Sequence, residues 1–176
     1  MKLTILGGGG FRTPLVYEAV ATGASGLIDG FSIDEIALYD IDAARLNAIE
    51  AVITTMRTEL GDGSGAVGPT LTVTTDLSRA VAGADYIFSA IRVGGALGRT
   101  RDERIALAAG ALGQETIGAG GLAYALRTIP VMRDIARTIA AKAPGAWVIN
   151  FTNPAGIVTE AMRGVLGDRV VGICDT

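Results

Sequence analysis

The fold is decided by the opening stretch Met1-Lys2-Leu3-Thr4-Ile5-Leu6-Gly7-Gly8-Gly9-Gly10-Phe11-Arg12-Thr13-Pro14. Its apolar run predicts a strand over residues 2–6, and an apolar, helix-compatible stretch over about residues 14–22 follows the glycines. Glycine lets the backbone turn sharply and approach a ligand closely, because it has no Cβ. A helix that starts directly after such a turn offers unpaired N–H groups and a positive dipole end to a phosphate. This layout is typical of the first strand and turn of a dinucleotide-binding domain.

The glycine spacing matches the dinucleotide pattern in part. Gly7 and Gly9 occupy the first two positions of G-x-G-x-x-G, whereas Arg12 stands at the third. The motif alone therefore leaves a plain tight turn between strand and helix as an alternative. The segment 32–40 favours the nucleotide interpretation, because it predicts a second strand over residues 33–39 that ends in the acid Asp40. An acid there accepts hydrogen bonds from the adenosine ribose, which favours NAD over its 2′-phosphorylated relative.

Asp40 and Asp42 compete for this ribose position. The distance from the glycines exceeds the usual ~20 residues, and a loop at residues 23–30 accounts for the excess. Asp42 is better explained as a residue at a helix N-terminus, so we assign the ribose to Asp40. The predicted cofactor-binding residues are Gly7, Gly8, Gly9, Gly10, Phe11, Arg12, Asp40 and Asn150.

Strands and helices alternate along the rest of the chain. Further strands are predicted over 70–74, 85–90, 146–150 and 170–173, and further helices over 42–60, 76–83, 100–112, 121–142 and 154–164, with loops at 61–69 and 92–98. This alternation predicts an α/β fold, with a doubly wound, mainly parallel sheet and helices on both faces. Residues 1–176 are expected to form one dinucleotide-binding domain.

Composition narrows the class of protein. Hydrophobic residues make up 49% of the 176 residues, enough for a core, and the net charge of −3 argues against a nucleic-acid or anionic-membrane surface. The sequence has no apolar stretch of ~20 residues and no signal-peptide layout. The single cysteine excludes an internal disulfide, so we expect a cytoplasmic protein. The chain stops directly after an apolar strand, and we therefore expect it to be part of a longer enzyme.

Polar residues follow the predicted strands at their carboxyl ends. They are Asp40 after the second strand, Arg92 and Arg99 after the fourth, Asn150 and Asn153 after the fifth, and Cys174 and Asp175 after the sixth. Because the carboxyl ends of parallel strands meet at one edge of a sheet, we expect these residues to share a binding crevice.

Several segments together resemble the N-terminal part of glycoside hydrolase family 4, most closely its 6-phospho-β-glucosidases. They are residues 7–14 (GGGGFRTP), 38–42 (LYDID), 91–95 (IRVGG), 113–116 (GQET), 118–121 (GAGG), 150–155 (NFTNPA) and 172–175 (GICD). Each motif alone is weak, but together they cover the whole chain in order. The family is a NAD-dependent exception to two-carboxylate glycoside hydrolysis.

The resemblance implies a NAD- and divalent-metal-dependent hydrolysis of 6-phospho-glycosides, with Mn²⁺ expected as the metal. Such enzymes oxidise the sugar at C3, eliminate the aglycone, add water and return the hydride, while the metal acts as a Lewis acid. The substrate would be a phosphorylated disaccharide or glycoside, and the full-length protein a homo-oligomer. The family's metal-binding histidine and tyrosine base have no match among these residues, so we expect residues 1–176 alone to be inactive.

Individual roles are carried over by matching residues. Cys174 matches the metal-binding cysteine, Asn153 a residue that contacts the sugar hydroxyls, and Arg99 the 6-phosphate site, with Arg92 as the other candidate arginine. Glu115 matches a substrate-holding glutamate and is assigned to the catalytic set together with Asp175. The alternatives are a buried apolar thiol for Cys174, a helix N-cap for Asn153 and for Glu115, and a solvated arginine for Arg99.

The anomeric preference is left open by two features. The Phe11-Arg12-Thr13-Pro14 turn is similar to that of β-specific members, whereas an aspartate at Asp175 is commoner in α-specific members, where it serves as general acid. A 6-phospho-α-glucosidase is therefore the alternative within the family. Outside the family, the alternatives are a lactate/malate-type NAD-dependent dehydrogenase and a nucleotide-binding module without chemistry of its own.

Overall fold

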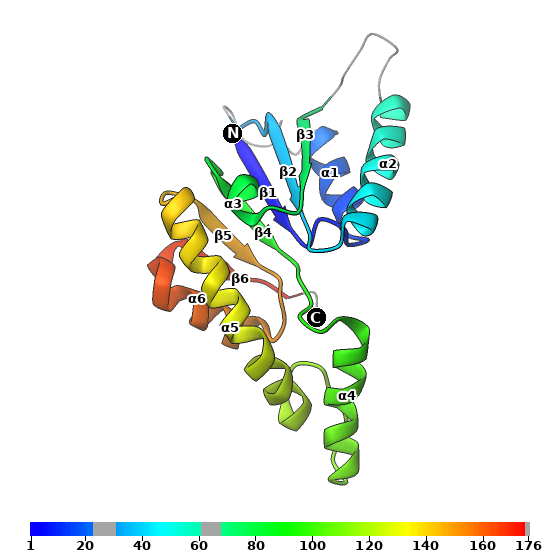
Figure 1. The fold of residues 1–176 in the computed structure, drawn as a ribbon, viewed down its shortest axis with the longest axis vertical. Coiled ribbons are helices and arrows are strands. Elements are labelled where there is room, and N and C mark those ends of the chain that lie inside the picture. The colour runs from blue at the N-terminus through cyan, green and yellow to red at the C-terminus, as the bar shows by residue number, and fades with distance from the viewer. Residues whose placement is uncertain (23–30, 61–67, 175–176) are drawn as a thin grey trace. The chain divides into compact units, whose positions relative to one another are not determined.

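A computed structural model describes residues 1–22, 31–60 and 68–174 (Figure 1). Its strands are β1 (Lys2–Leu6), β2 (Glu35–Tyr39), β3 (Thr70–Thr74), β4 (Tyr86–Ser89), β5 (Trp147–Asn150) and β6 (Val170–Gly172). Its helices are α1 (Thr13–Ala21), α2 (Ala43–Leu60), α3 (Leu77–Val81), α4 (Gly95–Ala108), α5 (Gly118–Lys142) and α6 (Ala155–Leu166). The strands form an all-parallel sheet in the order β3-β2-β1-β4-β5-β6, which confirms the predicted doubly wound fold.

The chain divides into two compact units, and Met1–Phe88 is the first. Its strand pairs run in register, with Leu3 opposite Ile36. Successive side chains of a strand point to opposite faces. Leu3 and Ile5 accordingly join a buried core with Tyr17 of α1 and with residues of α2. On the other face, the Thr4 hydroxyl donates a hydrogen bond of 2.9 Å to the carbonyl of Ala80 in α3. In this unit α1 and α2 thus cover one face of the sheet and α3 the other.

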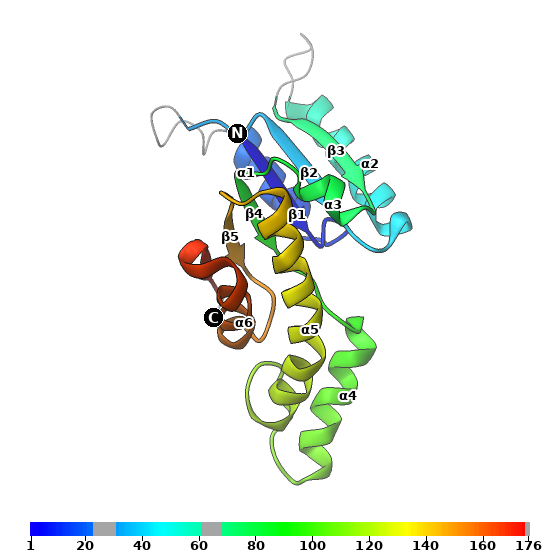
Figure 2. The same ribbon diagram turned by 60° about the vertical axis from the view of Figure 1, so that its left-hand side comes forward.

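The second unit is Ser89–Thr176. Here α5 packs against both α4 and α6, and α6 in turn covers β5 and β6. Figure 2 shows α4 beside the first turns of α5, with α6 along the later turns. Val148 of β5 pairs with Val170 of β6 in parallel register. None of the helices in the described part of the chain is long and apolar enough to cross a membrane.

The predicted order of elements is confirmed, and the differences lie near glycines. Residues 92–98 were expected to form a loop, but α4 already begins at Gly95, after Gly94 in a left-handed conformation with φ of 84°. Gly98 lies inside α4, and the space is tight there, because a Cβ would come within 3.1 Å of the Arg127 guanidinium. Close packing therefore outweighs the poor helix propensity of glycine. Likewise α5 begins at Gly118 instead of residue 121. The predicted loops at 23–30 and 61–67 lie outside the described residues.

Candidate functional site

The glycine turn after β1 is fastened to the end of β2. The backbone N–H groups of Gly7 and Gly8 both donate to the Tyr39 carbonyl, at 2.9 and 2.7 Å, and that of Gly10 donates to the Gly7 carbonyl at 2.8 Å. A Cβ on Gly8 would lie 2.8 Å from the Cβ of Leu38, so only glycine fits between these strands. The N–H groups of Gly7, Gly8 and Gly10 therefore hold the turn together, and the role of the glycines is to let the backbone pass closely.

Asp40 is part of this turn as well as a candidate ligand for ribose. Its Oδ2 accepts a hydrogen bond of 3.1 Å from the Gly9 N–H, and its Oδ1 accepts one of 3.2 Å from the Asp42 N–H. A carboxylate has about four acceptor positions, so this half-buried group keeps capacity for ribose hydroxyls. The Asp42 carboxylate accepts from the N–H groups of Ala44 and Arg45 at the start of α2, which confirms its helix-capping role. The residues present therefore fit the adenosine part of NAD.

Exposed apolar side chains flank the glycine turn and Asp40. Phe11 is 73% exposed, and the Arg12 guanidinium lies 4.7 Å from its ring centroid. Ile41, next to Asp40, is 87% exposed. The predicted contacts of Phe11 and Arg12 with the cofactor stay predictions.

In the second unit, Glu115 joins the two predicted phosphate-binding arginines. Its Oε1 lies 2.5 Å from an Arg92 terminal nitrogen, and its Oε2 lies 3.3 Å from one of Arg99. The Arg99 Nε donates a hydrogen bond of 2.7 Å to Glu103 in the next turn of α4. The hydrogen bond that Arg99 donates to Glu103 and the nearby charge of Glu115 raise the pKa of Arg99. Arg92, Arg99 and Glu115 thus form one ion-pair cluster, which we call the arginine–glutamate cluster.

Sequence reasoning missed a further ion pair in this unit, between the buried Asp102 and the partly exposed Arg127. Asp102 is 3% exposed and receives two hydrogen bonds from Arg127, at 2.9 and 2.5 Å. The Arg127 Nε also donates to the Val93 carbonyl at 3.0 Å. The Tyr124 ring has the Arg92 guanidinium 5.7 Å and the Arg127 guanidinium 5.4 Å from its centroid. Burial raises the pKa of the Tyr124 phenol. The only sequence signal for this arrangement is the i, i+4 spacing of Gly94 and Gly98, which leaves room for Arg127.

Asn150, predicted to contact the cofactor, has its side chain occupied by the loop between β5 and α6. The side chain is fully buried. Its amide nitrogen lies 3.2 Å from the Thr152 carbonyl and 3.1 Å from the Thr159 hydroxyl, and its carbonyl oxygen accepts from the Thr152 N–H at 3.1 Å. The side chain of Asn150 therefore positions this loop, and the predicted contact of Asn150 with the cofactor stays a prediction.

This loop also reaches Asn153 and the residue before Cys174. The Ile173 N–H donates a 3.0 Å hydrogen bond to the Asn150 carbonyl, so Cys174 directly follows a backbone that is fixed to β5. Cys174 is exposed, which contradicts the alternative of a buried apolar thiol. Asn153 is half-buried, and α6 is capped by Pro154 without a side-chain hydrogen bond, so Asn153 is not the helix cap.

Cys174 is the one metal ligand that the sequence predicted. A thiolate is a suitable ligand for a divalent transition metal. The described residues contain no group of three or more His, Cys, Asp or Glu side chains that could hold a metal ion. Asp175, the predicted general acid, lies outside the described residues. The described part of the chain therefore fits one protein ligand of a metal and not a complete set.

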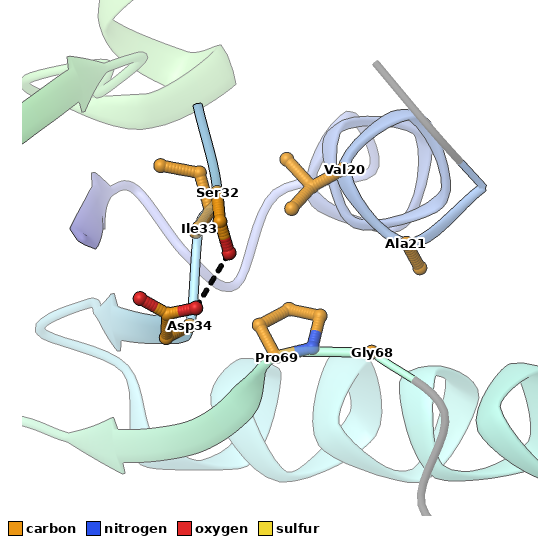
Figure 3. A pocket seen from close by; sticks show the side chains of 7 residues that line it. All are labelled: Val20, Ala21, Ser32, Ile33, Asp34, Gly68 and Pro69. Carbon is orange, nitrogen blue, oxygen red and sulfur yellow. Dashed lines mark hydrogen bonds between the residues drawn. The ribbon is translucent and has the colours of Figure 1, made fainter. Parts of the chain in front are cut away.

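A pocket of about 320 Å³ lies away from these residues (Figure 3). It is lined by Val20, Ala21, Ser32, Ile33, Asp34, Gly68 and Pro69. These residues precede β2 and β3 or end α1, so the pocket lies at the strand starts, whereas the glycine turn follows a strand end. The Ser32 hydroxyl donates to the Asp34 carboxylate at its rim, at 2.5 Å. None of the predicted site residues lines it.

The parallel strand order, the glycine turn and the acid at the end of β2 together define a Rossmann-like nucleotide-binding domain. The chain belongs to the family 4 glycosyl hydrolases, whose family model, described as "Family 4 glycosyl hydrolase", matches residues 2–176. The resemblance inferred from the sequence motifs is thereby confirmed.

Individual relatives agree with this assignment. The chain is 39% identical over 179 residues to the 6-phospho-beta-glucosidase of Escherichia coli, covering 99% of this chain and 38% of that protein. It is similar to a 6-phospho-alpha-glucosidase from gut microorganisms, solved with NAD and Mn²⁺, with a TM-score of 0.85, 36% identity and coverage of 99% of this chain and 39% of that one. The 6-phospho-beta glucosidase of Thermotoga maritima, solved with manganese, NAD⁺ and glucose-6-phosphate, gives a TM-score of 0.87 at 29% identity, covering 100% of this chain and 41% of that one. This chain thus spans well under half the length of each of these relatives.

Proposed function

We propose that residues 1–176 are the NAD-binding part of a longer enzyme that hydrolyses 6-phospho-glycosides with the help of NAD and a divalent metal, Mn²⁺ being expected. The observation that carries this proposal is the family match over residues 2–176. It is supported by the fastening of Asp40 to the glycine turn and by the arginine–glutamate cluster in the second unit. We expect the β-anomer of a phosphorylated disaccharide or glycoside as substrate.

The first unit would hold the cofactor. When bound, NAD supplies a hydride acceptor and donor, and the metal supplies a Lewis acid. Asp40 would accept hydrogen bonds from the ribose hydroxyls, and its negative charge would repel a 2′-phosphate. The glycines would let the backbone approach the pyrophosphate closely, with Phe11 and Arg12 at the start of α1. The carboxylate of Asp40 would thus both hold the turn and select the nucleotide.

The second unit would hold the sugar and one metal ligand. Arg99, with Arg92, would bind the 6-phosphate, because a guanidinium forms paired, charge-assisted hydrogen bonds to phosphate oxygens. Glu115 and Asn153 would bind sugar hydroxyls, and Cys174 would bind the metal as a thiolate. Asp175 would act as general acid. The side chain of Asn150 would hold the loop that carries Asn153.

An activity assay of the full-length protein tests the function and the anomer together. Nitrophenyl 6-phospho-β- and 6-phospho-α-glucosides would be incubated with NAD⁺ and Mn²⁺, and release of nitrophenol and formation of NADH followed in parallel. We expect cleavage of the β-anomer without net NADH. Cleavage of the α-anomer alone would assign the protein to the α-specific members of the family.

The same assay separates the other function classes. Net reduction of NAD⁺ by a 2-hydroxy acid would indicate a lactate/malate-type dehydrogenase, which the family membership disfavours. Neither activity would indicate a nucleotide-binding module without chemistry of its own. Residues 1–176 expressed alone should bind NAD⁺ without cleaving glycosides, because the relatives that cleave them are much longer.

A further inference from the structure

We infer that Glu115 is an internal counter-anion, which the phosphoryl group of the substrate displaces from Arg92 and Arg99. This inference rests on the proposed function, since it takes the arginine–glutamate cluster as the phosphate site. It adds a specificity device: the site would open for a phosphorylated sugar and stay closed for an unphosphorylated one.

The charges in the cluster already balance. The two guanidinium groups of Arg92 and Arg99 lie within 2.5 and 3.3 Å of the Glu115 carboxylate, and Arg99 also pairs with Glu103 at 2.7 Å. Two positive charges therefore face two negative ones. A further anion would meet no net attraction while Glu115 keeps this position. Phosphate binding to the arginines thus requires the carboxylate of Glu115 to leave.

The exposure of the two arginine side chains allows a phosphate from solvent to replace the Glu115 carboxylate. The side chains of Arg92 and Arg99 are 36% and 48% exposed, whereas that of Glu115 is 18% exposed. An incoming anion can therefore reach the guanidinium groups, although they are occupied. A phosphate ester near neutral pH carries close to two negative charges and three strong acceptor oxygens. It can therefore compete with a carboxylate of single charge, which a neutral sugar cannot do.

The groups around the cluster allow only the Glu115 side chain to move when phosphate binds. Arg127 is committed to Asp102 and to the Val93 carbonyl, so it does not offer a second phosphate site. The backbone on both sides of Glu115 is closely packed. A Cβ on Gly120 would lie 2.6 Å from the Gln114 carbonyl oxygen, and one on Gly121 would lie 2.4 Å from the carbonyl carbon of Thr116. The movement therefore consists of a rotation of the Glu115 side chain, after which its carboxylate is available to sugar hydroxyls.

The test compares Glu115→Gln with the wild-type full-length protein in calorimetric titrations with inorganic phosphate. Glutamine keeps the size and removes the competing charge, so phosphate should bind roughly tenfold more tightly to the variant. Glu160→Gln, at an exposed acid on α6, is the matched control and should leave phosphate affinity unchanged. The double variant Arg99→Ala, Glu115→Gln should not show this tighter phosphate binding. Glucose without phosphate should bind the variant no better than the wild type.

Equal or weaker phosphate binding by Glu115→Gln would overturn the inference, and so would the absence of phosphate binding in both proteins. The proposed function fails by a different result, namely no cleavage of either 6-phosphoglucoside by the wild type. NAD⁺ affinity, measured in the same samples, should be equal in all variants. If Glu115→Gln alters NAD⁺ binding, Glu115→Ala is used in its place. It removes the same charge and must show the same increase in phosphate affinity.

Discussion

At the scale of single residues, Asp40 performs a structural task and, in the proposed function, a binding task with one carboxylate. Its two oxygens accept hydrogen bonds from the N–H groups of Gly9 and Asp42, one from each side of the turn. Because an unpaired backbone N–H costs about 1–3 kcal/mol when buried, the loss of Asp40 would affect both the turn and the nucleotide. A substitution that tests nucleotide binding must therefore disturb the hydrogen bonds of the turn as little as it can.

Asp40→Asn in the full-length protein should reduce the preference for NAD⁺ over NADP⁺. Asparagine keeps one acceptor oxygen, so one of the two backbone hydrogen bonds of the turn is retained, while the charge that repels a 2′-phosphate is removed. We expect the ratio of NADP⁺ to NAD⁺ dissociation constants to fall roughly tenfold or more. Calorimetric titration measures both constants. Asp42→Asn is the control, because asparagine also caps helices; an equal change in that variant would remove the assignment of Asp40.

Cys174→Ser should weaken Mn²⁺ binding by the full-length protein at least about tenfold, because a serine hydroxyl ionises far less readily than a thiol. Metal binding is measured directly from the spin-resonance signal of free Mn²⁺, independently of turnover. NAD⁺ binding and thermal stability should stay unchanged, since Cys174 is exposed. Alkylation of the thiol should be slowed by Mn²⁺ with substrate. Unaltered Mn²⁺ affinity in the serine variant would rule out Cys174 as a metal ligand.

At the scale of elements, glycines decide how closely strands and helices approach. A Cβ on Gly8 would meet the Leu38 Cβ at 2.8 Å and the Leu38 Cα at 3.0 Å, so β2 would have to move. A Cβ on Gly164, in α6, would meet nothing within 4 Å. Replacement of glycine by alanine is therefore expected to lower the free energy of unfolding at Gly8 and to raise it at Gly164.

Gly8→Ala should destabilise the protein by about 1–3 kcal/mol, the usual cost of overpacking, and should weaken NAD⁺ binding. Gly164→Ala should stabilise it by about 0.5 kcal/mol, because alanine has the higher helix propensity. Urea unfolding of both variants beside the wild type provides the free energies. Equal tolerance of alanine at Gly8 and Gly164 would contradict the close approach of the turn to β2.

The elements themselves were largely predictable from local sequence patterns. The apolar residues of α2 recur at helical spacing, and Leu46 and Ile53 are indeed buried, whereas Val52 from the same pattern is 45% exposed on the outer side. Asp76 caps α3 by accepting a hydrogen bond from the Arg79 N–H, and a helix was predicted to start at this residue. The errors came from glycines, whose local meaning depends on distant neighbours. Gly98 indicates a loop by propensity, but it lies within α4, where the side chain of the sequence-distant Arg127 occupies the space beside it.

At the scale of the whole molecule, three buried or half-buried tyrosines should make the free energy of unfolding fall at alkaline pH. Burial raises the pKa of Tyr17, Tyr39 and Tyr124 above 10.0, and the carboxylates of Asp40 and Asp76 add to the effect at Tyr39. The unfolded chain then loses phenol protons at a lower pH than the folded chain. The contribution to stability is complete below the unfolded pKa and is lost as the pH rises through the folded values.

The free energy of unfolding should therefore fall between about pH 9 and pH 11. Urea unfolding at several pH values measures this slope. In the native protein, phenolate absorbance should also appear at higher pH than in the unfolded protein. Tyr124→Phe should make the slope shallower. A native titration that coincides with the unfolded one would contradict the burial of these phenols.

The candidate site was predictable as a set of residues and not as a set of contacts. Arg92, Arg99 and Glu115 were each named from motifs, but their mutual ion pairing was not, because it depends on how α4 leads into α5. Asn150 was named from its place at a strand end, but the hydrogen bonds of its buried side chain to the following loop were not predicted. Asp102 and Arg127 carry no motif at all. A motif identifies which side chains lie near a strand end, and only packing decides which of them face a ligand.

The ion pair of Asp102 and Arg127 also restricts which substitutions the protein can accept at neighbouring positions. The guanidinium of Arg127 fills the space that side chains at Gly94 and Gly98 would need, and it neutralises a carboxylate that is almost wholly shielded from water. Loss of Arg127 alone would leave the buried carboxylate of Asp102 unpaired, and a side chain at either glycine would force the Arg127 guanidinium to move. We therefore expect the tolerance of each of these four positions to substitution to depend on the residues at the other three.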